Sequence, residues 1–202
     1  MKLIGAQPSP FTRKIRILLT EKSLPFEFIL DAPWEATNLI DAHNPLGQVP
    51  CLILNNGYTV YDSRVIEDFL EDIAPMHIPS DVTMRLAVKK WAALADGMLD
   101  AGVKIRVETA MRPADKQHQP WIDRQTAKIM RGLDLMETHL THHLWCANNM
   151  YSLADVSTVC MLGFLDYRLP TLEWRESHPH VAKLANYLNE QTVFAETLPY
   201  DA

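Results

Sequence analysis

The sequence is poor in glycine, and its few glycines are not arranged to hold phosphate groups. Glycine accounts for 7 of 202 residues, about half of the usual ~7%. No G-x-G-x-x-G occurs, and the one G-x-x-x-x-G, from Gly97 to Gly102, is followed by Val103 instead of lysine. Those two patterns cradle phosphates in dinucleotide-binding folds and in P-loops. The sequence therefore excludes both classes of nucleotide site.

A basic excess is also missing. The chain has 19 Lys and Arg against 25 Asp and Glu, which gives a net charge of −6, whereas proteins that bind nucleic acid usually carry a surplus of positive charge. Arg13, Lys14 and Arg16 lie close together on one predicted helix. We interpret them as a solvated or interface face of that helix, and we expect no nucleic-acid partner.

The chain lacks a long apolar run. The longest strongly apolar stretch without charge has ten residues, from Val156 to Leu165, and a membrane span needs ~20. The N-terminal residues contain no apolar region of the kind that signal peptides have, and they reach Arg13 early. We therefore expect a cytoplasmic protein with no membrane partner.

Cysteine is scarce, and the number and spacing of the cysteines do not suggest disulfide bonds. The three cysteines, Cys51, Cys146 and Cys160, are odd in number, show no C-x-x-C spacing and have apolar neighbours. These features are typical of reduced, buried thiols in a cytoplasmic protein.

The first ~75 residues alternate between strand and helix patterns, as an α/β domain does. The predicted elements are strands at 2–5 and 26–30, a helix from Pro10, a weakly helical stretch at 34–43, a hairpin at 51–60 and a helix around 65–73. The hairpin prediction rests on Asn55-Asn56-Gly57, a strong turn signal. This order predicts one parallel pair of strands followed by an antiparallel hairpin.

Prolines then interrupt the chain, and no strand pattern follows them. The later predicted elements are helices at about 82–111 and about 118–144, a helix that opens at Ser152, and a helix after Pro179. We therefore divide the chain into an α/β domain at 1–75, a linker at 76–82 and an all-helical domain at 83–202.

Three short motifs carry candidate chemistry. Ser9-Pro10-Phe11 lies between the first predicted strand and the first predicted helix. Serine is a good N-cap, and a helix N-terminus attracts anions. The run from Asn44 to Pro50 reads N-P-L-G-Q-V-P and precedes the hairpin, and Asp62-Ser63 opens the next helix.

In their order and spacing these motifs resemble the glutathione S-transferase family, in particular its bacterial, serine-type members. The resemblance covers essentially the whole chain and implies an α/β thioredoxin-like N-terminal domain followed by an all-α C-terminal domain. Ser152-Leu153-Ala154-Asp155 also resembles the capping box at the start of the family's buried helix.

The resemblance assigns roles to individual residues. Ser9 takes the catalytic position, where its hydroxyl would donate a hydrogen bond to the glutathione thiolate; serine cannot form a mixed disulfide, so thiol-transfer chemistry is disfavoured. Val49-Pro50 matches a cis-proline turn that pairs with the cysteinyl part of glutathione, and Asp62-Ser63 would hold the γ-glutamyl end. The implied glutathione-binding set is Phe11, Trp34, Gln48, Val49, Pro50, Asp62 and Ser63.

Three of these positions depart from the family pattern or stay ambiguous. Gln48 stands where many members have a lysine against the glycyl carboxylate, and a neutral amide gives up charge assistance there. Pro8 is less usual before the catalytic serine. Trp34 either closes the site or is a core or rim aromatic.

The implied function is a glutathione transferase of detoxification type that activates the glutathione thiol for attack on a small hydrophobic electrophile, with glutathione as co-substrate, no metal, and a homodimeric assembly. Two alternatives stay open: a non-catalytic interaction protein on the same fold, and a glutathione-dependent isomerase or dehalogenase. Met98, Gly102 and Arg106 share one helix face and either line the electrophile pocket or are ordinary core and surface residues.

The sequence also contains one cluster of possible metal ligands. Its members are Glu137, His139, His142, His143 and Cys146. His139 and His143 are i, i+4 on a helix, a spacing that can chelate zinc. No H-E-x-x-H is present, however, and histidines favour a helix C-terminus because of its negative dipole. We interpret the cluster as a helix end.

Overall fold

A computed structural model describes residues 1–35 and 37–200 of the chain. Contacts group these residues into two units: Met1–Met76 together with the residues from Gln191 onward, and His77–Glu190. This grouping differs from the predicted ranges at the C-terminal end, because residues 191–200 pack with the N-terminal unit. Each unit is described below by itself.

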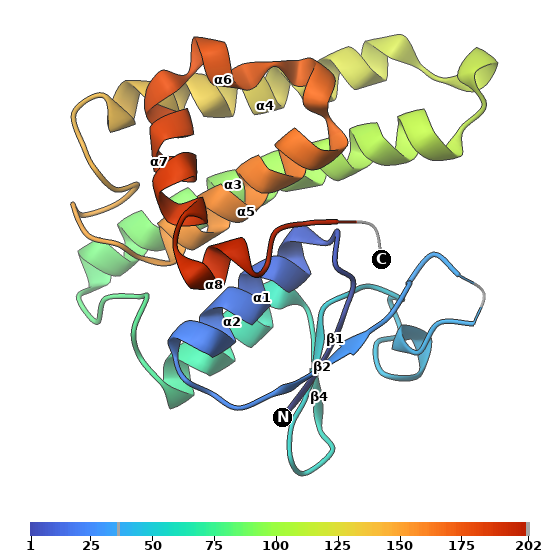
Figure 1. Cartoon of the computed structure of the whole chain (residues 1–202), viewed down its shortest axis with the longest axis vertical. Coiled ribbons are helices and arrows are strands. Elements are labelled where there is room, and N and C mark those ends of the chain that lie inside the picture. The colour runs from blue at the N-terminus through green and yellow to red at the C-terminus, as the bar shows by residue number, and fades with distance from the viewer. Residues whose placement is uncertain (36, 201–202) are drawn as a thin grey trace. The chain divides into compact units, whose positions relative to one another are not determined.

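The first unit is built on a four-stranded mixed sheet in the order β2-β1-β3-β4 (Figure 1). Its strands are β1 (Lys2–Gly5), β2 (Glu27–Leu30), β3 (Cys51–Ile53) and β4 (Thr59–Val60). β1 and β2 are parallel, whereas β3 is antiparallel to both β1 and β4. The predicted parallel pair and hairpin are therefore confirmed.

Alternation of side chains along the strands gives the sheet two apolar faces. Ile4 and Cys51 pair in register and are buried in a cluster with Ile40, which lies on the connecting segment. Leu3 and Leu52, the next pair in register, are also fully buried and point to the opposite face.

Helices α1 (Pro10–Glu21) and α2 (Ser63–Ile73) pack against each other in this unit (Figure 1). Two ion pairs join them: Lys14 with Glu67, both almost fully buried, and Lys22 with Glu71. The predicted face was solvated or part of an interface, and for Lys14 the solvated alternative is therefore wrong. A buried ammonium is tolerated only with a partner, and this partner lies more than fifty residues further along the chain.

The segment between β2 and β3 is mostly irregular, so the weakly helical stretch predicted at 34–43 is wrong for most of its described residues. One 3₁₀ turn, η1 (Ile40–Ala42), is found there. The buried carboxylate of Asp31 accepts hydrogen bonds from the backbone N–H groups of Leu39 and Ile40, at 3.0 and 2.8 Å. Such side-chain bonds give the backbone N–H groups partners without a regular helix.

The last described residues return to the first unit through α8 (Thr192–Ala195). The Arg13 guanidinium, 2% exposed, donates to the Phe194 carbonyl at 3.1 Å and to Thr197 Oγ1 at 3.4 Å. Arg13 is therefore also buried, and two of its guanidinium nitrogens bond the C-terminal segment.

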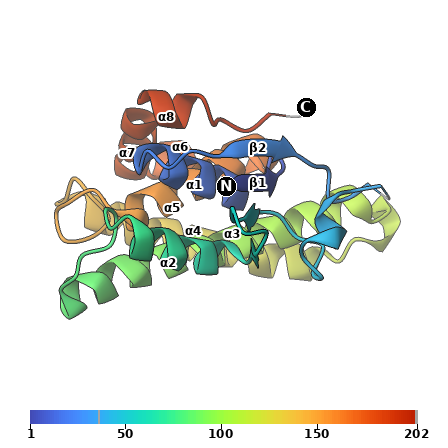
Figure 2. The ribbon, with the colours of Figure 1, turned by 90° about the horizontal axis from the view of Figure 1, so that it is seen from below.

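The second unit is all-helical, as predicted, and Figure 2 shows its long helices from below. Its α-helices are α3 (Val82–Met111), α4 (Gln119–Leu140), α5 (Leu153–Arg168), α6 (Trp174–Ser177) and α7 (Pro179–Asn189). Short 3₁₀ turns lie at Ala114–Lys116 (η2) and Pro170–Leu172 (η3). The predicted helix at about 118–144 ends four residues early, and α6 was not predicted.

Helix α5 forms the centre of this unit. Every residue from Leu153 to Leu165 is buried, and the helix contacts both α3 and α7. A helix that is apolar all round belongs in a core, which explains the ten-residue apolar run. Among the described residues, no helix combines the length and apolar character needed to cross a membrane.

Candidate functional site

Three sequence motifs converge at one edge of the sheet in the first unit. β1 ends at Gly5, β3 begins at Cys51 and β4 ends at Val60, and the register pairs Ile4 with Cys51 and Leu52 with Val60. Since β3 runs against its two neighbours, the end of β1, the start of β3 and the end of β4 lie at the same edge. The segments that carry Ser9, Val49-Pro50 and Asp62 leave or enter the sheet there.

Ser9 is the N-cap of α1 and is half-buried. Its Oγ accepts a hydrogen bond from the backbone N–H of Thr12 at 3.2 Å. A hydroxyl that accepts through a lone pair keeps its own hydrogen for donation. Within residues 1–35 and 37–200, no acceptor for that hydrogen is found. The Ser9 hydroxyl can therefore donate to a ligand without giving up its capping bond.

The turn before β3 is held by Asn44. The Asn44 side chain accepts from the Leu46 N–H at 3.0 Å and donates to the Gln48 carbonyl at 2.7 Å. Gly47 has φ +60, a backbone conformation that favours glycine because other residues rarely adopt it. The Val49–Pro50 peptide bond is cis, as the family resemblance implies. Asn44 is thus a site-shaping residue that our list of binding residues missed, although Asx turns are a recognisable sequence signal.

Asp62 is the N-cap of α2 and is exposed. Its Oδ1 accepts from the Arg64 N–H at 2.9 Å, and within the described residues this is the one hydrogen bond of the Asp62 carboxylate. The second carboxylate oxygen is therefore available to a cation. Ser63 follows in the first turn and is buried. The Tyr61–Asp62 peptide bond is cis as well.

The remaining predicted binding residues differ in exposure. Trp34 is 72% exposed, which rules out a core role. It follows β2, whose end lies at the same edge as the end of β1 because the two strands are parallel. Gln48 is exposed, and Phe11 is half-buried in the first turn of α1. Within the part of the chain that the structure describes, no side-chain hydrogen bond is found for Trp34 or Gln48.

Cys51 lies directly after Pro50, but it is not a competing nucleophile. Burial raises the pKa of its thiol, which donates to the His43 carbonyl at 3.8 Å. Cys146 and Cys160 are also buried, and neither is in a disulfide bond, as expected. Burial together with the neighbouring Asp155 carboxylate raises the pKa of Cys146 far more. The raised pKa values keep Cys51 and Cys146 in the unreactive thiol form, since the reactive form of cysteine is the thiolate.

The histidine cluster is a helix end in the structure. The rings of His139 and His143 stack with centroids 4.1 Å apart, His139 Nε2 lies 3.2 Å from the Trp145 carbonyl, and His143 Nδ1 lies 2.9 Å from the His139 carbonyl. Burial and the neighbouring His143 lower the pKa of His139. In the described part of the chain, no group of three or more His, Cys, Asp or Glu side chains is placed to hold a metal.

Two of the candidate pocket residues on α3 are core residues of the helical unit. Met98 is 2% exposed, and a Cβ on Gly132 would meet its sulfur at 2.3 Å. Gly102 is buried with Phe164, whose ring a Cβ would meet at 3.0 Å. Gly102 and Gly132 both allow neighbouring helices to approach closely. The third candidate pocket residue, Arg106, is exposed.

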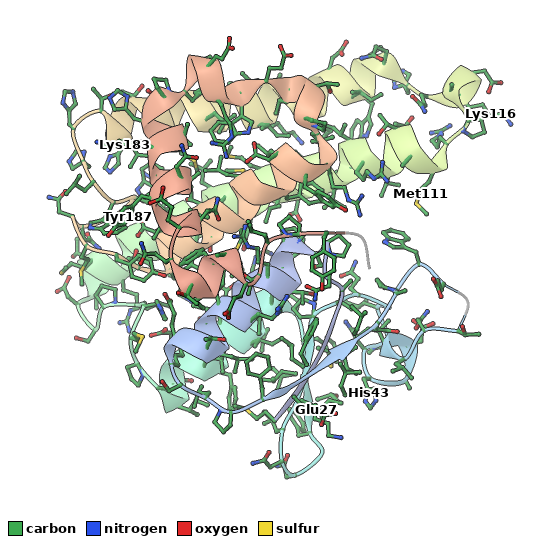
Figure 3. The ribbon with its side chains drawn as sticks, in the orientation of Figure 1. Glu27, His43, Met111, Lys116, Lys183 and Tyr187 are labelled. Carbon is green, nitrogen blue, oxygen red and sulfur yellow. The ribbon has the colours of Figure 1, made fainter. Side chains whose placement is uncertain are left out.

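An open depression of about 500 Å³ lies at the turn between α3 and α4. Figure 3 labels Met111 and Lys116 at this turn. Inside it, Glu108 accepts from the His118 N–H at 2.8 Å and pairs with Arg112 at 3.4 Å. Its charged groups already serve to close the turn, and it contains none of the predicted site residues.

Comparison with known proteins places the chain among close relatives. Family models described as the N-terminal and the C-terminal domain of glutathione S-transferase match residues 8–73 and 119–184. The uncharacterized GST-like protein YibF of Escherichia coli (strain K12) is 39% identical over 201 residues, which is 98% of each chain.

Two solved structures of similar proteins contain glutathione or an analogue. A glutathione S-transferase from Methylobacterium radiotolerans, in complex with glutathione sulfonate, has a TM-score of 0.94 and 36% identity, and the match covers 100% of this chain and 95% of that one. A glutathione S-transferase from Methylobacillus flagellatus with glutathione bound has a TM-score of 0.94 and 37% identity, over 98% and 99% of the two chains.

Proposed function

The chain belongs to the glutathione S-transferase family, and we propose from this that it binds glutathione at the sheet edge of its first unit and activates the thiol for attack on a small hydrophobic electrophile. The observation that carries the proposal is the half-buried Ser9 hydroxyl, which caps α1 through a lone pair and keeps its hydrogen for a ligand. The two relatives with glutathione or its sulfonate bound support it.

Activation follows from what a hydroxyl does beside sulfur. A free thiol has a pKa near ~8.5 and is mostly protonated at neutral pH. A hydrogen bond from Ser9 stabilises the thiolate more than the thiol, and a charge-assisted bond contributes roughly 1.5–3 kcal/mol. That is about one to two pKa units. The thiol proton passes to solvent, and the thiolate sulfur bonds to the electrophilic carbon as that carbon's bond to a leaving group breaks and the leaving group departs with the electron pair; in an addition, the π bond breaks instead and its far atom takes a proton from solvent.

The other predicted residues bind the tripeptide. In this proposal the Val49 backbone pairs with the cysteinyl amide, and the unpaired carboxylate oxygen of Asp62 takes the γ-glutamyl ammonium. The N-terminus of α2, with Ser63, takes the γ-glutamyl carboxylate. Gln48, Phe11 and Trp34 lie around the same edge; Gln48 offers an amide in place of a charge to the glycyl carboxylate.

Calorimetry with reduced glutathione tests this proposal, followed by turnover with a panel of electrophiles. We expect binding at millimolar glutathione or below and conjugation of at least one electrophile. The absence of any heat or chemical-shift change at millimolar glutathione would favour a non-catalytic interaction protein on the same fold. Recovery of unconsumed glutathione after turnover would favour an isomerase.

We also propose a cytoplasmic homodimer with a detoxification role. Three buried cysteines outside any disulfide bond fit a reducing compartment, and homo-oligomers most often have two-fold symmetry. Light scattering should give about twice the 23.0 kDa mass of the chain. A mass of one chain across the micromolar range would contradict the dimer.

A further inference from the structure

The C-terminal segment, residues 191–200, contacts the loop that presents Ser9. Gln7, two residues before Ser9, donates from Nε2 to the hydroxyl oxygen of Tyr200 at 2.9 Å. Figure 1 shows the chain after α8 running past the loop between β1 and α1. This contact joins residues 193 positions apart, and the roles assigned to the glutathione-binding residues make no use of it.

Arg16 sets the orientation of the Gln7 amide. The Arg16 Nη1 donates to Gln7 Oε1 at 2.6 Å, and its Nη2 donates to the Glu196 carbonyl at 3.5 Å. Because a guanidinium has only donors, the amide must turn its oxygen toward Arg16 and its NH₂ group toward Tyr200. One arginine on α1 therefore connects the Ser9 loop and the C-terminal segment.

A second arginine fixes the segment one turn after Ser9. The buried Arg13 guanidinium donates to the Phe194 carbonyl and to Thr197 Oγ1. Bonds to a buried charged donor are among the stronger ones in a protein. The C-terminal segment is thus attached on both sides of Ser9: at Gln7 in the loop before it, and at Arg13 in the helix after it.

We infer that the C-terminal segment is a positioning element for Ser9, with Tyr200 and Gln7 as positioning residues. Pro8 separates Gln7 from Ser9, and its fixed φ passes a displacement of Gln7 on to Ser9. Loss of the Tyr200 contact would move the hydroxyl relative to bound sulfur, while the Asp62 end of the site stays in place. This inference rests on the proposed function, because it assigns Tyr200 a role through Ser9.

Tyr200→Phe removes only the hydroxyl oxygen that accepts from Gln7, and Tyr58→Phe is the matched control, since Tyr58 is an exposed tyrosine of the same unit on the hairpin. Tyr200→Phe should lower kcat about three- to tenfold near neutral pH and leave glutathione affinity unchanged. Tyr58→Phe should change neither. Gln7→Leu should lower kcat by the same factor as Tyr200→Phe. The double variant of Gln7→Leu with Tyr200→Phe should lower kcat no further than either single variant.

The decisive experiment is the double variant with Ser9→Ala. If Tyr200 acts through Ser9, Tyr200→Phe should cause no further loss of kcat in the Ser9→Ala background. An equal loss in both backgrounds, or no loss in the wild-type background, would overturn the inference. If the wild-type protein fails to bind glutathione, the proposed function fails instead. In that case, hydrogen exchange of the Thr12 amide, which donates to Ser9 Oγ, still tests the positioning of Ser9. Faster exchange in Tyr200→Phe than in wild type supports the inference, and equal exchange overturns it.

Discussion

The two units each contain a helix capped by a serine, and the two serines differ in what they have left to offer. In the second unit, Ser152 is 1% exposed; its Oγ accepts from Ala154 N–H and donates to Asp155 Oδ2 at 3.2 Å. In the first unit, Ser9 is half-buried and accepts from Thr12 alone. The Ser152 hydroxyl both donates and accepts within the protein, whereas the Ser9 hydroxyl still has its hydrogen to donate.

The aspartates at these helix starts repeat the contrast. Asp155 uses both carboxylate oxygens, accepting from the backbone N–H groups of Cys146 and Ser152 at 2.8 and 2.9 Å. Asp62 uses one oxygen, for Arg64. The same two residue types thus build a closed cap in one unit and an open one in the other. The lesson is that a capping motif identifies a binding site only where its polar atoms are incompletely paired and within reach of solvent.

The closed cap should be the more damaging one to remove. Asp155→Ala leaves two backbone N–H groups and the Ser152 hydroxyl buried without an acceptor, and each such group costs about 1–3 kcal/mol. We expect the free energy of unfolding to fall by about 3–5 kcal/mol. Urea unfolding measures it, with the exposed Asp115→Ala as the control. A loss below about 1 kcal/mol would remove the contrast between the two caps.

The open cap should matter for turnover more than for stability. Ser9→Ala should cost about 1 kcal/mol of stability, as the loss of an N-cap does. It should lower kcat near neutral pH ten- to a hundredfold, which corresponds to ~1.4–2.8 kcal/mol of barrier. Ser152→Ala, the matched serine cap, should lower stability without lowering kcat of the folded enzyme. Equal kcat in wild type and Ser9→Ala would make Ser9 a structural cap like Ser152.

Asp62 should affect the affinity for glutathione, whereas Ser9 should affect kcat. Asp62→Ala removes the open carboxylate and should weaken glutathione binding by about 1–3 kcal/mol, through loss of a charge-assisted contact. Calorimetry measures the affinity directly. Asp72→Ala, an exposed aspartate at the other end of α2, is the control. An unchanged affinity in Asp62→Ala would show that its second oxygen is not used.

Glu137 is a third carboxylate whose oxygens are bonded at a helix start, and its contribution to stability depends on pH. Burial raises the pKa of Glu137, but the bonds from the His180 ring and from the His180 and Val181 N–H groups at the start of α7 outweigh it and lower the pKa below its usual value. A lowered folded pKa stabilises the protein above the unfolded value, ~4.3, and this contribution is lost as pH falls through the folded value.

Glu137→Gln should therefore lower the free energy of unfolding by about 1 kcal/mol at neutral pH. The difference from wild type should shrink as pH falls from the unfolded value, ~4.3, toward the lower folded pKa of Glu137, and below the folded pKa both side chains are neutral. Urea unfolding at several pH values tests this. A difference that does not change with pH would assign the effect to packing.

The sequence predicts the parts of the site that depend on local pattern. Ser9 and Asp62 are N-caps that begin helices, and the Asn55-Asn56-Gly57 turn sets the hairpin register that brings β3 and β4 to the same edge. Strand register and connection order then bring the three motifs together.

What the sequence does not predict depends on partners far away along the chain. Arg13 and Lys14 read as surface charges, because their partners at Phe194 and Glu67 carry no local signal. The contact between Gln7 and Tyr200 has the same origin. The described residues between β2 and β3 were mispredicted because Asp31 holds an irregular path that their weak helical pattern does not reveal.

The most direct test of an open Ser9 cap is the ultraviolet absorbance of the thiolate in the glutathione complex as a function of pH. Wild type and Ser152→Ala should titrate together, with a midpoint below that of free glutathione. Ser9→Ala should titrate about one to two pH units higher, since one charge-assisted hydrogen bond to sulfur is lost. Superimposable curves for wild type and Ser9→Ala would contradict the account and assign thiol activation to the backbone N–H groups at the start of α1.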